Sequence, residues 1–247
     1  MGFFDFLNKN ITKLLPDLSI IGTDIHSHLI PGIDDGSKSV EESLMLIHEL
    51  YELGYHKIVT TPHIMSDYYK NTPEIILAGL ERLRRELEIL KLPVTIEAAA
   101  EYYLDYEFQK KIGTEKFLTL GDNYILFELS YLSPPQSIEN VIFNLQTNGY
   151  KTILAHPERY IYWNNNFEMY ERLKDRDVYF QININSLSGE YSPSSKKTVE
   201  TLIKKNMVDF IGSDLHNMHH IETIKTLLDN KHLIKLIESG KLLNHKI

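Results

Sequence analysis

The chain of 247 residues contains no cysteine. This absence excludes disulfide bonds, metal sites built from thiolates, and any reaction that uses a cysteine nucleophile. The chain also contains no run of 18 or more apolar residues, so the sequence predicts no membrane-spanning helix and no stable membrane insertion. No block rich in proline, glycine or serine divides the chain, which favours one domain over two domains joined by a linker.

Basic residues are the minority among the charged side chains, with 26 Lys and Arg against 34 Asp and Glu and a net charge of -8. Proteins that bind nucleic acid usually gather a basic face, so this balance argues against such a partner and is consistent with a site rich in carboxylates. Residues 1–18 are largely apolar but contain Asp5 and lack a small-residue cleavage site, which argues against a signal peptide. We expect residues 1–18 to be an N-terminal appendage, residues 19–247 to form a single domain, and the protein to be cytoplasmic.

Short β-branched segments alternate with longer amphipathic segments along the chain. We expect strands in "SIIGTDIHSH", "HKIVTTPH", "VTIEAAAE", "YILFELS", "KTILAHP", "VYFQININ" and "VDFIGSD". We expect helices over residues 40–53, 73–90, 138–148, 167–175 and 196–206, two of them followed by the helix-ending glycines Gly54 and Gly149. Seven strand–helix units of roughly 30 residues predict an α/β protein with parallel strands, because parallel neighbours need a crossover helix between them.

Histidines and carboxylates recur where these expected strands end. In parallel β/α folds the C-terminal ends of the strands gather at one rim, which is where sites form. Six of the seven strands place such residues there, and one acid lies in the loop after the first strand. The candidates are His26, His28, Asp35, His63, Glu101, Glu128, His156, Asp214 and His216.

This donor set points to metal ions. A buried ring of carboxylates is costly to ionise without cations, and mixed His and Asp/Glu ligands suit divalent manganese, iron or zinc. Nine donors are too many for one ion and fit two or three ions with a carboxylate bridging two of them. His48, His56, His232 and His245 lie away from the strand ends, and we expect no ligand role for them. His219 and His220 are close enough in sequence to line the rim.

Several motifs between residues 24 and 217 resemble one known family. The stretches are "DIHSHLIPGIDDG", "TTPH", "AEYY", "LFELSY", "AHPERY", "QININSLSG" and "GSDLHN". They are similar to the PHP (polymerase and histidinol phosphatase) superfamily, and within it to the bacterial manganese-dependent protein-tyrosine phosphatases of the CpsB/YwqE type. The resemblance implies a distorted TIM-like (β/α)7 barrel and a trinuclear metal centre, with manganese as the expected metal and iron or zinc as alternatives.

The resemblance also implies roles for individual residues. His26, His28, Glu101 and Asp214 would hold one ion; Glu101, Glu128 and His156 a second; and Asp35, His63 and His216 a third, with Asp34 nearby but not coordinating. Arg159 would bind the substrate phosphate as the catalytic arginine. The chain departs from the family pattern at Ala100, where glycine is usual, and at His220, where arginine is frequent.

The chemistry implied is hydrolysis of phosphotyrosine on proteins, with a bacterial tyrosine kinase of polysaccharide synthesis or export, through its C-terminal tail, as the expected partner. Two adjacent cations lower the pKa of a shared water, so we expect direct attack by metal-bound hydroxide without a phosphoenzyme. A phenol with a pKa of about 10 is a comparatively good leaving group. Tyr102, Tyr131 and His220 are the further candidates for substrate contacts, with Tyr102 and Tyr131 beside motif residues.

Other functions remain open from the residues alone. The nearest alternative is a small-molecule phosphatase of the histidinol phosphatase kind. A nuclease is disfavoured by the acidic balance of the chain. A non-catalytic scaffold domain stabilised by metal is the alternative from another class, and the oligomeric state is left open by the sequence.

Overall fold

The computed structural model describes residues 18–136, 138–164 and 166–247, so the expected N-terminal appendage, apart from Leu18, lies outside the described residues. The strands are β1 Thr23–Asp24, β2 Lys57–Thr60, β3 His63–Ile64, β4 Thr95–Ala98, β5 Glu101–Tyr103, β6 Tyr124–Glu128, β7 Lys151–Ala155, β8 Tyr179–Asn183 and β9 Phe210–Gly212. The helices are α1 Val40–Glu52, α2 Pro73–Leu90, α3 Tyr106–Lys111, α4 Ile138–Thr147, α5 Phe167–Lys174, α6 Pro193–Lys204, α7 Met218–Thr226 and α8 Lys231–Glu238.

Within these residues the strands form a three-stranded sheet, β1-β2-β4, and a six-stranded sheet, β3-β5-β6-β7-β8-β9. Every pairing within the two sheets is parallel, as the alternation of strands and helices predicts. The two sheets continue into each other, because β2 and β3 are halves of one segment broken at Pro62, which lacks an N–H. Across this break Ala99 N donates to Thr60 O at 2.9 Å and Glu101 N donates to Pro62 O at 3.1 Å.

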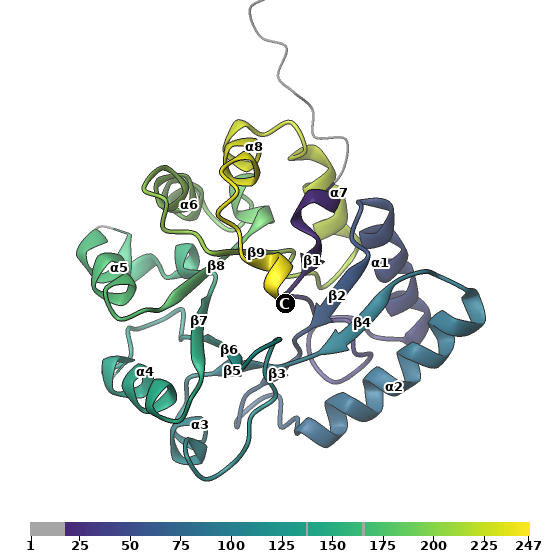
Figure 1. The fold of residues 1–247 in the computed structure, drawn as a ribbon, viewed down its shortest axis with the longest axis horizontal. Helices are drawn as coiled ribbons and strands as arrows, with labels where there is room; N and C mark the ends of the chain where they lie inside the picture. The colour runs from purple at the N-terminus through teal and green to yellow at the C-terminus, as the bar shows by residue number, and fades with distance from the viewer. Residues whose placement is uncertain (1–17, 137, 165) are drawn as a thin grey trace, which may run out of the picture.

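The remaining junction lies between β9 and β1. Just past these strands, Asp214 N donates to His26 O at 2.8 Å and His28 N donates to Leu215 O at 2.9 Å. At the other end of the strands the buried Asn244 side chain donates to Thr23 O and Ile211 O and accepts from Ile211 N. Seven parallel segments therefore follow one another around a ring, with the strands in the middle and the helices outside (Figure 1).

Each of the seven expected strand segments contains strand residues, and the five expected helices form as α1, α2, α4, α5 and α6. Gly54 and Gly149 follow α1 and α4 with φ of 103° and 86°, the conformation expected after a helix end. The short helix α3 and the helices α7 and α8 were not anticipated. Asp105, Asn217 and Asn230 begin these three helices by accepting hydrogen bonds from backbone N–H groups of the first turn.

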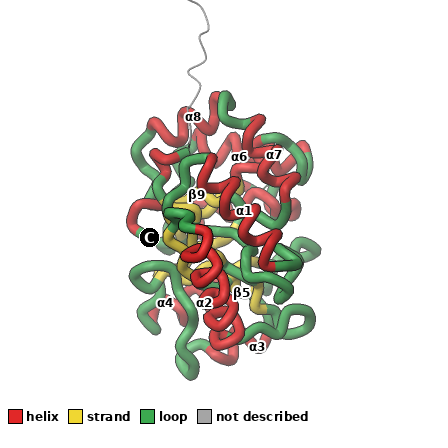
Figure 2. The backbone as a smooth tube through the Cα atoms, turned by 90° about the vertical axis from the view of Figure 1, so that its right-hand side faces the viewer, coloured by secondary structure: helices red, strands yellow, loops and turns green. Residues whose placement is uncertain are grey.

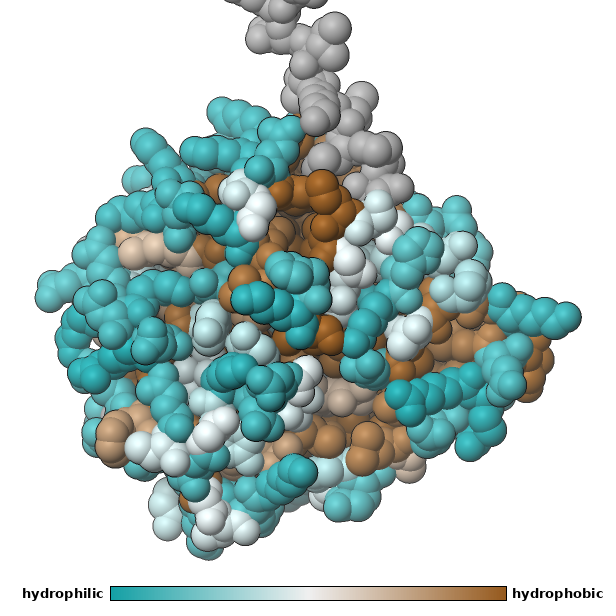
Figure 3. Space-filling model, in the orientation of Figure 1, coloured by the Kyte–Doolittle hydropathy of each residue, from teal (hydrophilic) through white to brown (hydrophobic). Residues whose placement is uncertain are grey.

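The buried apolar side chains form two clusters. The larger one lies between the strands and the surrounding helices, and the smaller one fills the inside of the ring with residues such as Ile25, Val59, Leu126 and Phe210, joined by Ile247. Figure 2 shows the same layering from the side, with strands enclosed by helices. The face in Figure 3 is hydrophilic over most of its periphery, with apolar side chains towards its middle and at the α2 end.

None of the helices in the described part of the chain combines the length and apolar character that crossing a membrane requires.

Candidate metal centre

The structure brings all nine candidate ligands to one end of the ring. His63 and Glu101 begin β3 and β5, Glu128 ends β6, and His156 directly follows β7. Since all pairings are parallel, these residues converge although up to 190 positions separate them in sequence. Ligand atoms from this set form overlapping groups within 4.8 Å of one another: His28, Asp35, His63, His216; His26, His28, Asp214; His26, Glu101, His156; and His63, Glu101, Glu128.

The deepest group contains the two histidines that follow β1. His26 and His28 are fully buried, and their Nε2 atoms lie 3.4 Å apart. Asp214 Oδ1 lies 3.4 Å from each of these Nε2 atoms. Glu101 Oε2 lies 3.2 Å from the Nε2 atom of His26 and 3.5 Å from that of His28. Four donors from three strands therefore face one small volume.

Glu101 links this group to the next one. Its Oε1 lies 2.9 Å from His156 Nε2, while its Oε2 faces the deep histidines. Glu128 Oε2 lies 3.9 Å from the same His156 nitrogen. The two oxygens of one carboxylate thus face two donor groups, which is the arrangement of a bridging ligand.

The outermost group surrounds Asp35. Asp35 Oδ1 lies 3.5 Å from both His63 Nε2 and His216 Nε2. The other nitrogen of His63, Nδ1, faces inward, 3.1 Å from Glu101 Oε2 and 3.2 Å from Glu128 Oε1. His63 therefore stands between two of the donor groups rather than in one alone.

The donor set fits divalent cations. Two buried atoms at its centre, His63 Nδ1 and Glu101 Oε2, lie 3.1 Å apart but form no hydrogen bond with each other or with any other group of the described residues, although buried polar atoms normally form one. Burial alone would lower the pKa of His26, but the carboxylates of Glu101 and Asp214 raise it to about 9. Against the effect of burial, the histidines hold the pKa values of Glu101 and Asp214 well below the usual range. Protons on histidines thus balance the carboxylates, and a cation would replace those protons.

A second set of side chains orients the inner histidines. Asp34 Oδ2 lies 2.8 Å from His28 Nδ1, and Gln181 Oε1 lies 2.8 Å from His26 Nδ1. In the neutral rings these contacts would place the proton on Nδ1 and leave the Nε2 lone pair facing the centre, as outer partners of metal-binding histidines do. Asn183 Nδ2 donates to Asp214 Oδ2 at 2.6 Å. Gln181 and Asn183 were missed by the sequence reasoning, which sought ionisable residues and found none at the end of β8.

Two glycines allow the backbone to pack this tightly. A Cβ atom on Gly36 would lie 2.2 Å from His28 O, and one on Gly212 would lie 2.7 Å from His26 Cβ. The loop that carries Asp34 and Asp35 therefore folds directly back onto His28, and β9 packs directly against His26. Any larger residue at these two positions would push the candidate ligands apart.

Arg159 lies beside the donor groups, in the 3-10 turn Pro157–Arg159 that follows β7. Its Nη1 donates to Asp214 Oδ2 at 3.0 Å. The guanidinium lies 4.7 Å from the centre of the Tyr131 ring and 4.2 Å from that of Tyr191. Two aromatic rings and one carboxylate thus set the direction of a planar cation suited to phosphate. Tyr191, from the loop before α6, was not anticipated because nothing in its local sequence marks it.

The further substrate candidates fall into two groups. Tyr131 lines the cavity, and its hydroxyl donates to Glu128 Oε2 at 3.4 Å. His220 also lines it, 2.9 Å from Asp214 O through Nδ1, and burial lowers its pKa, which favours the neutral ring. Tyr102 does not line this cavity: its side chain is buried on the opposite face of β5, where its hydroxyl accepts from Leu118 N at 2.7 Å. Side chains alternate along a strand, so Tyr103 shares the side of Glu101 and lines the cavity instead.

The cavity over the donor groups has a volume of about 670 Å³. Its floor consists of seven of the candidate ligands, and Arg159, Tyr131, Tyr191 and His220 stand around them. Tyr68 and Leu132 also line it, with 76% and 95% of their surfaces exposed. The arrangement can hold cations at the bottom, an anion beside Arg159 and an apolar group near the mouth.

Comparison with known proteins gives three findings. The family model described as "Capsular polysaccharide synthesis, CpsB/CapC" matches residues 22–231. The tyrosine-protein phosphatase CpsB of Streptococcus pneumoniae is 31% identical over 201 residues, which cover 79% of this chain and 83% of that protein. The tyrosine-protein phosphatase YwqE of Bacillus subtilis is 29% identical over 196 residues, covering 79% and 77% of the two chains.

One chain of known crystal structure is similar to this protein along nearly its whole length. It comes from the crystal structures of YwqE from Bacillus subtilis and CpsB from Streptococcus pneumoniae, described as unique metal-dependent tyrosine phosphatases. The TM-score is 0.78 at 26% identity, and the similarity covers 91% of this chain and 94% of that one.

Proposed function

The chain belongs to the CpsB/CapC family of capsular polysaccharide synthesis proteins, and from this membership we propose that it is a metal-dependent phosphatase that hydrolyses phosphotyrosine on proteins. The observation that carries the proposal is the joint placement of overlapping His/carboxylate groups and a braced arginine at one cavity. Metal sites alone would suit many hydrolases. The adjacent guanidinium adds a place for a phosphoryl group.

We assign two or three divalent cations to the donor groups, with manganese as the expected metal and iron or zinc as alternatives. The proposed ligand sets are His26, His28, Glu101 and Asp214; Glu101, Glu128 and His156; and Asp35, His63 and His216. Cations held by these residues would lower the pKa of a bound water and offset charge on phosphoryl oxygens. The two-sided placement of Glu101 supports shared ligation. Its Oε2 lies among the nitrogens of three histidines without forming a hydrogen bond, which supports a cation next to it.

The remaining residues position the substrate. Arg159, held by Asp214 and by the rings of Tyr131 and Tyr191, donates to the phosphoryl oxygens as charge builds up on them. The phenolate of tyrosine, with a conjugate acid of pKa about 10, departs without a dedicated acid. The neutral ring of His220 lines the same cavity and is assigned a weaker contact than an arginine would make.

The partner we propose is a bacterial tyrosine kinase that acts in polysaccharide synthesis or export, dephosphorylated at its C-terminal tail. Membership of a capsular polysaccharide synthesis family supports this partner. The cytoplasmic location stays a prediction.

The experiment that tests the proposal measures hydrolysis of a phosphotyrosine peptide with added Mn²⁺. We expect His28→Ala to abolish turnover and to lower the metal content, because it removes a fully buried donor. We expect Arg159→Ala to lower turnover at unchanged metal content. His48→Ala, at a histidine whose side chain is 56% exposed on α1, is the matched control and should behave like wild type.

Two results would refute the assignment. Wild-type protein that binds metal tightly but hydrolyses no phosphotyrosine would favour the scaffold alternative. Faster turnover of histidinol phosphate than of the peptide would favour the small-molecule phosphatase.

A further inference from the structure

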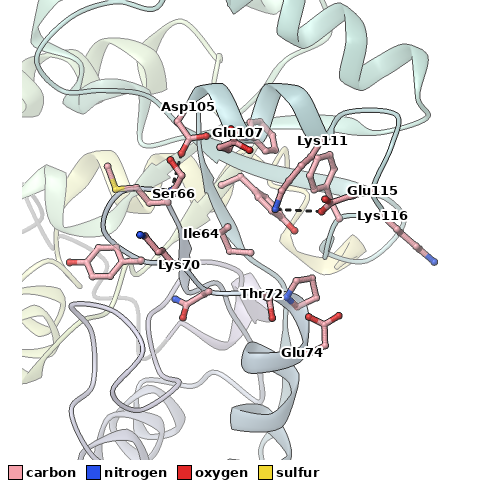
Figure 4. Close-up of a pocket in the computed structure, with 17 residues that line it drawn as sticks. Ile64, Ser66, Lys70, Thr72, Glu74, Asp105, Glu107, Lys111, Glu115 and Lys116 are labelled. Carbon is pink, nitrogen blue, oxygen red and sulfur yellow. Dashed lines mark hydrogen bonds and ion pairs between the residues drawn. The ribbon is translucent and has the colours of Figure 1, made fainter.

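A second cavity of about 400 Å³ lies next to the metal cavity, between the loop that joins β3 to α2 and the segment around α3. This volume falls within the range of about 300–1,000 Å³ that is usual for ligand sites. Figure 4 shows its wall residues, with Ile64, Ser66 and Lys70 on the first side and Asp105, Lys111 and Glu115 on the other. Met65 lines both cavities, so the two meet at this flexible side chain.

The inner surface of this cavity is aromatic. Tyr102, Phe108 and Phe117 line it, and their ring centres lie between 5.0 and 5.2 Å from one another. The Tyr102 hydroxyl accepts from Leu118 N, which satisfies its polar atom away from the cavity. The three aromatic residues are buried, with 3%, 4% and 6% of their surfaces exposed, so the three packed rings close the inner end of the cavity with a firm apolar surface.

The walls are tied together by Asp105. Its Oδ1 accepts from Phe108 N at 2.7 Å and so begins α3, while its Oδ2 accepts from Ser66 N at 2.9 Å. The loop carrying Ser66 is closed by reciprocal backbone bonds between Met65 and Tyr69. The cavity is thus formed before any ligand arrives, which lowers the entropic cost of binding.

Some of the charged residues that line this cavity form ion pairs and others do not. Lys111 forms an ion pair with Glu115 at 3.5 Å, and Asp105 is used within the walls. Across residues 18–136, 138–164 and 166–247, four further lining charges have no ion-pair partner: Lys70, Glu74, Glu107 and Lys116. Of these, Lys70 is the closest in sequence to Met65 and Tyr68, which line the metal cavity. An occupant with an apolar side chain and a nearby acidic group would match both the rings and Lys70.

We propose that this cavity binds the residues that flank the phosphotyrosine in the protein substrate. An apolar side chain of the substrate packs on the rings of Tyr102, Phe108 and Phe117, and an acidic residue next to it pairs with Lys70. The inference rests on the proposed function, since it needs a polypeptide whose phosphotyrosine occupies the metal cavity. The chain of that polypeptide passes over Met65, from one cavity into the other.

The test compares two substrates of the metal-loaded enzyme. One is a phosphotyrosine peptide with leucine and glutamate beside the phosphotyrosine, and the other is p-nitrophenyl phosphate, which has no flanking residues. Ser66→Trp fills the cavity with an indole while the backbone bond to Asp105 stays available. Asp67→Trp places the same ring on the neighbouring exposed residue, outside the lining, and is the matched control.

We expect Ser66→Trp to lower kcat/KM for the peptide at least tenfold and to change that for p-nitrophenyl phosphate less than twofold. Asp67→Trp should leave both values within twofold of wild type. Lys70→Glu, at an exposed position, should lower the peptide value about fivefold, whereas Lys110→Glu, exposed on α3 but outside the lining, should not.

The outcomes separate the two proposals. If wild type hydrolyses both substrates but Ser66→Trp and Lys70→Glu treat the peptide as wild type does, the cavity assignment is wrong and the proposed function stands. A parallel loss of both activities in Ser66→Trp, with a normal Lys70→Glu, also overturns the assignment. If wild type hydrolyses neither substrate, the proposed function itself fails.

Discussion

Asp34 provides the sharpest test of the proposed site, because it stands beside the proposed ligand Asp35 and is not itself assigned as a ligand. All three of its close partners are donors: His28 Nδ1 at 2.8 Å and His63 N at 3.1 Å to Oδ2, and Gly36 N at 3.0 Å to Oδ1. Asn at this position has one acceptor and one donor atom. An amide whose oxygen faces His28 must therefore turn its NH₂ group towards the Gly36 N–H, which leaves that contact unmade.

We expect Asp34→Asn to weaken metal binding about 10- to 100-fold, the usual effect of changing an outer partner of a metal-binding histidine. This corresponds to about 1.4–2.7 kcal/mol. Because the ligand atoms themselves remain, excess Mn²⁺ should restore most of the activity. His28→Ala, which removes a ligand atom, should not be restored.

The assay is calorimetric titration of the metal-free protein with Mn²⁺, together with peptide turnover over a range of Mn²⁺ concentrations. Asp67→Asn, at an exposed acid in the loop after β3, is the control and should titrate like wild type. An Asp34→Asn protein with wild-type affinity would show that the carboxylate does not orient His28. An Asp34→Asn protein that no concentration of Mn²⁺ restores would show that Asp34 is itself a ligand.

Three further predictions concern other contacts. Asn244→Ala should lower the free energy of unfolding by about 2–4 kcal/mol in denaturant titrations, because it removes three buried hydrogen bonds between β1 and β9; an unchanged midpoint would contradict this. Burial raises the pKa of Asp24 from 3.8 to about 6, although the hydrogen bonds from Ser213 act in the opposite direction. The folded state therefore binds this proton more tightly than the unfolded state, and the protein loses stability as the pH rises from 4 to 6. The Asp24→Asn variant lacks this loss. Its free energy of unfolding relative to wild type, measured with a chelator present, should therefore rise by about 3 kcal/mol between pH 4 and 7, and a difference that does not change with pH would refute the reasoning. Tyr191→Leu should lower kcat/KM for the peptide about tenfold by removing the ring against Arg159, while Tyr191→Phe keeps the ring and should stay within twofold; equal losses in both would assign the effect to the hydroxyl.

Most of the candidate ligands could be predicted from the sequence, because they stand at the ends of expected strands. His26 and His156 could be proposed as neighbours because both follow short β-branched runs, and parallel strands end at one rim. The helices with long apolar periodicity, such as α2, could also be predicted from the sequence. The six-residue helix α3 could not be predicted, because it is too short to show helical periodicity and only the cap residue Asp105 marks its start.

The placement of Tyr102 outside the metal cavity has a definite cause. Tyr102 directly follows Glu101, and adjacency in sequence suggested adjacency in the site. In a strand, however, neighbouring side chains point to opposite faces, so Tyr102 enters the aromatic cluster while Tyr103 reaches the cavity. Gln181 escaped notice for a different reason, since a neutral amide acquires meaning only when a histidine lies 2.8 Å away.

The sequence by itself determined the class of fold and the chemical kinds of the ligands, because periodicity and residue type are local properties. Tertiary structure decided which atoms face one another: that Glu101 turns its two oxygens to different groups, that His63 stands between two of them, and that Arg159 is held between two rings. These relations depend on side-chain directions summed over several strands and loops. No short stretch of the chain contains them, because each joins residues that only the closing of the ring brings into contact.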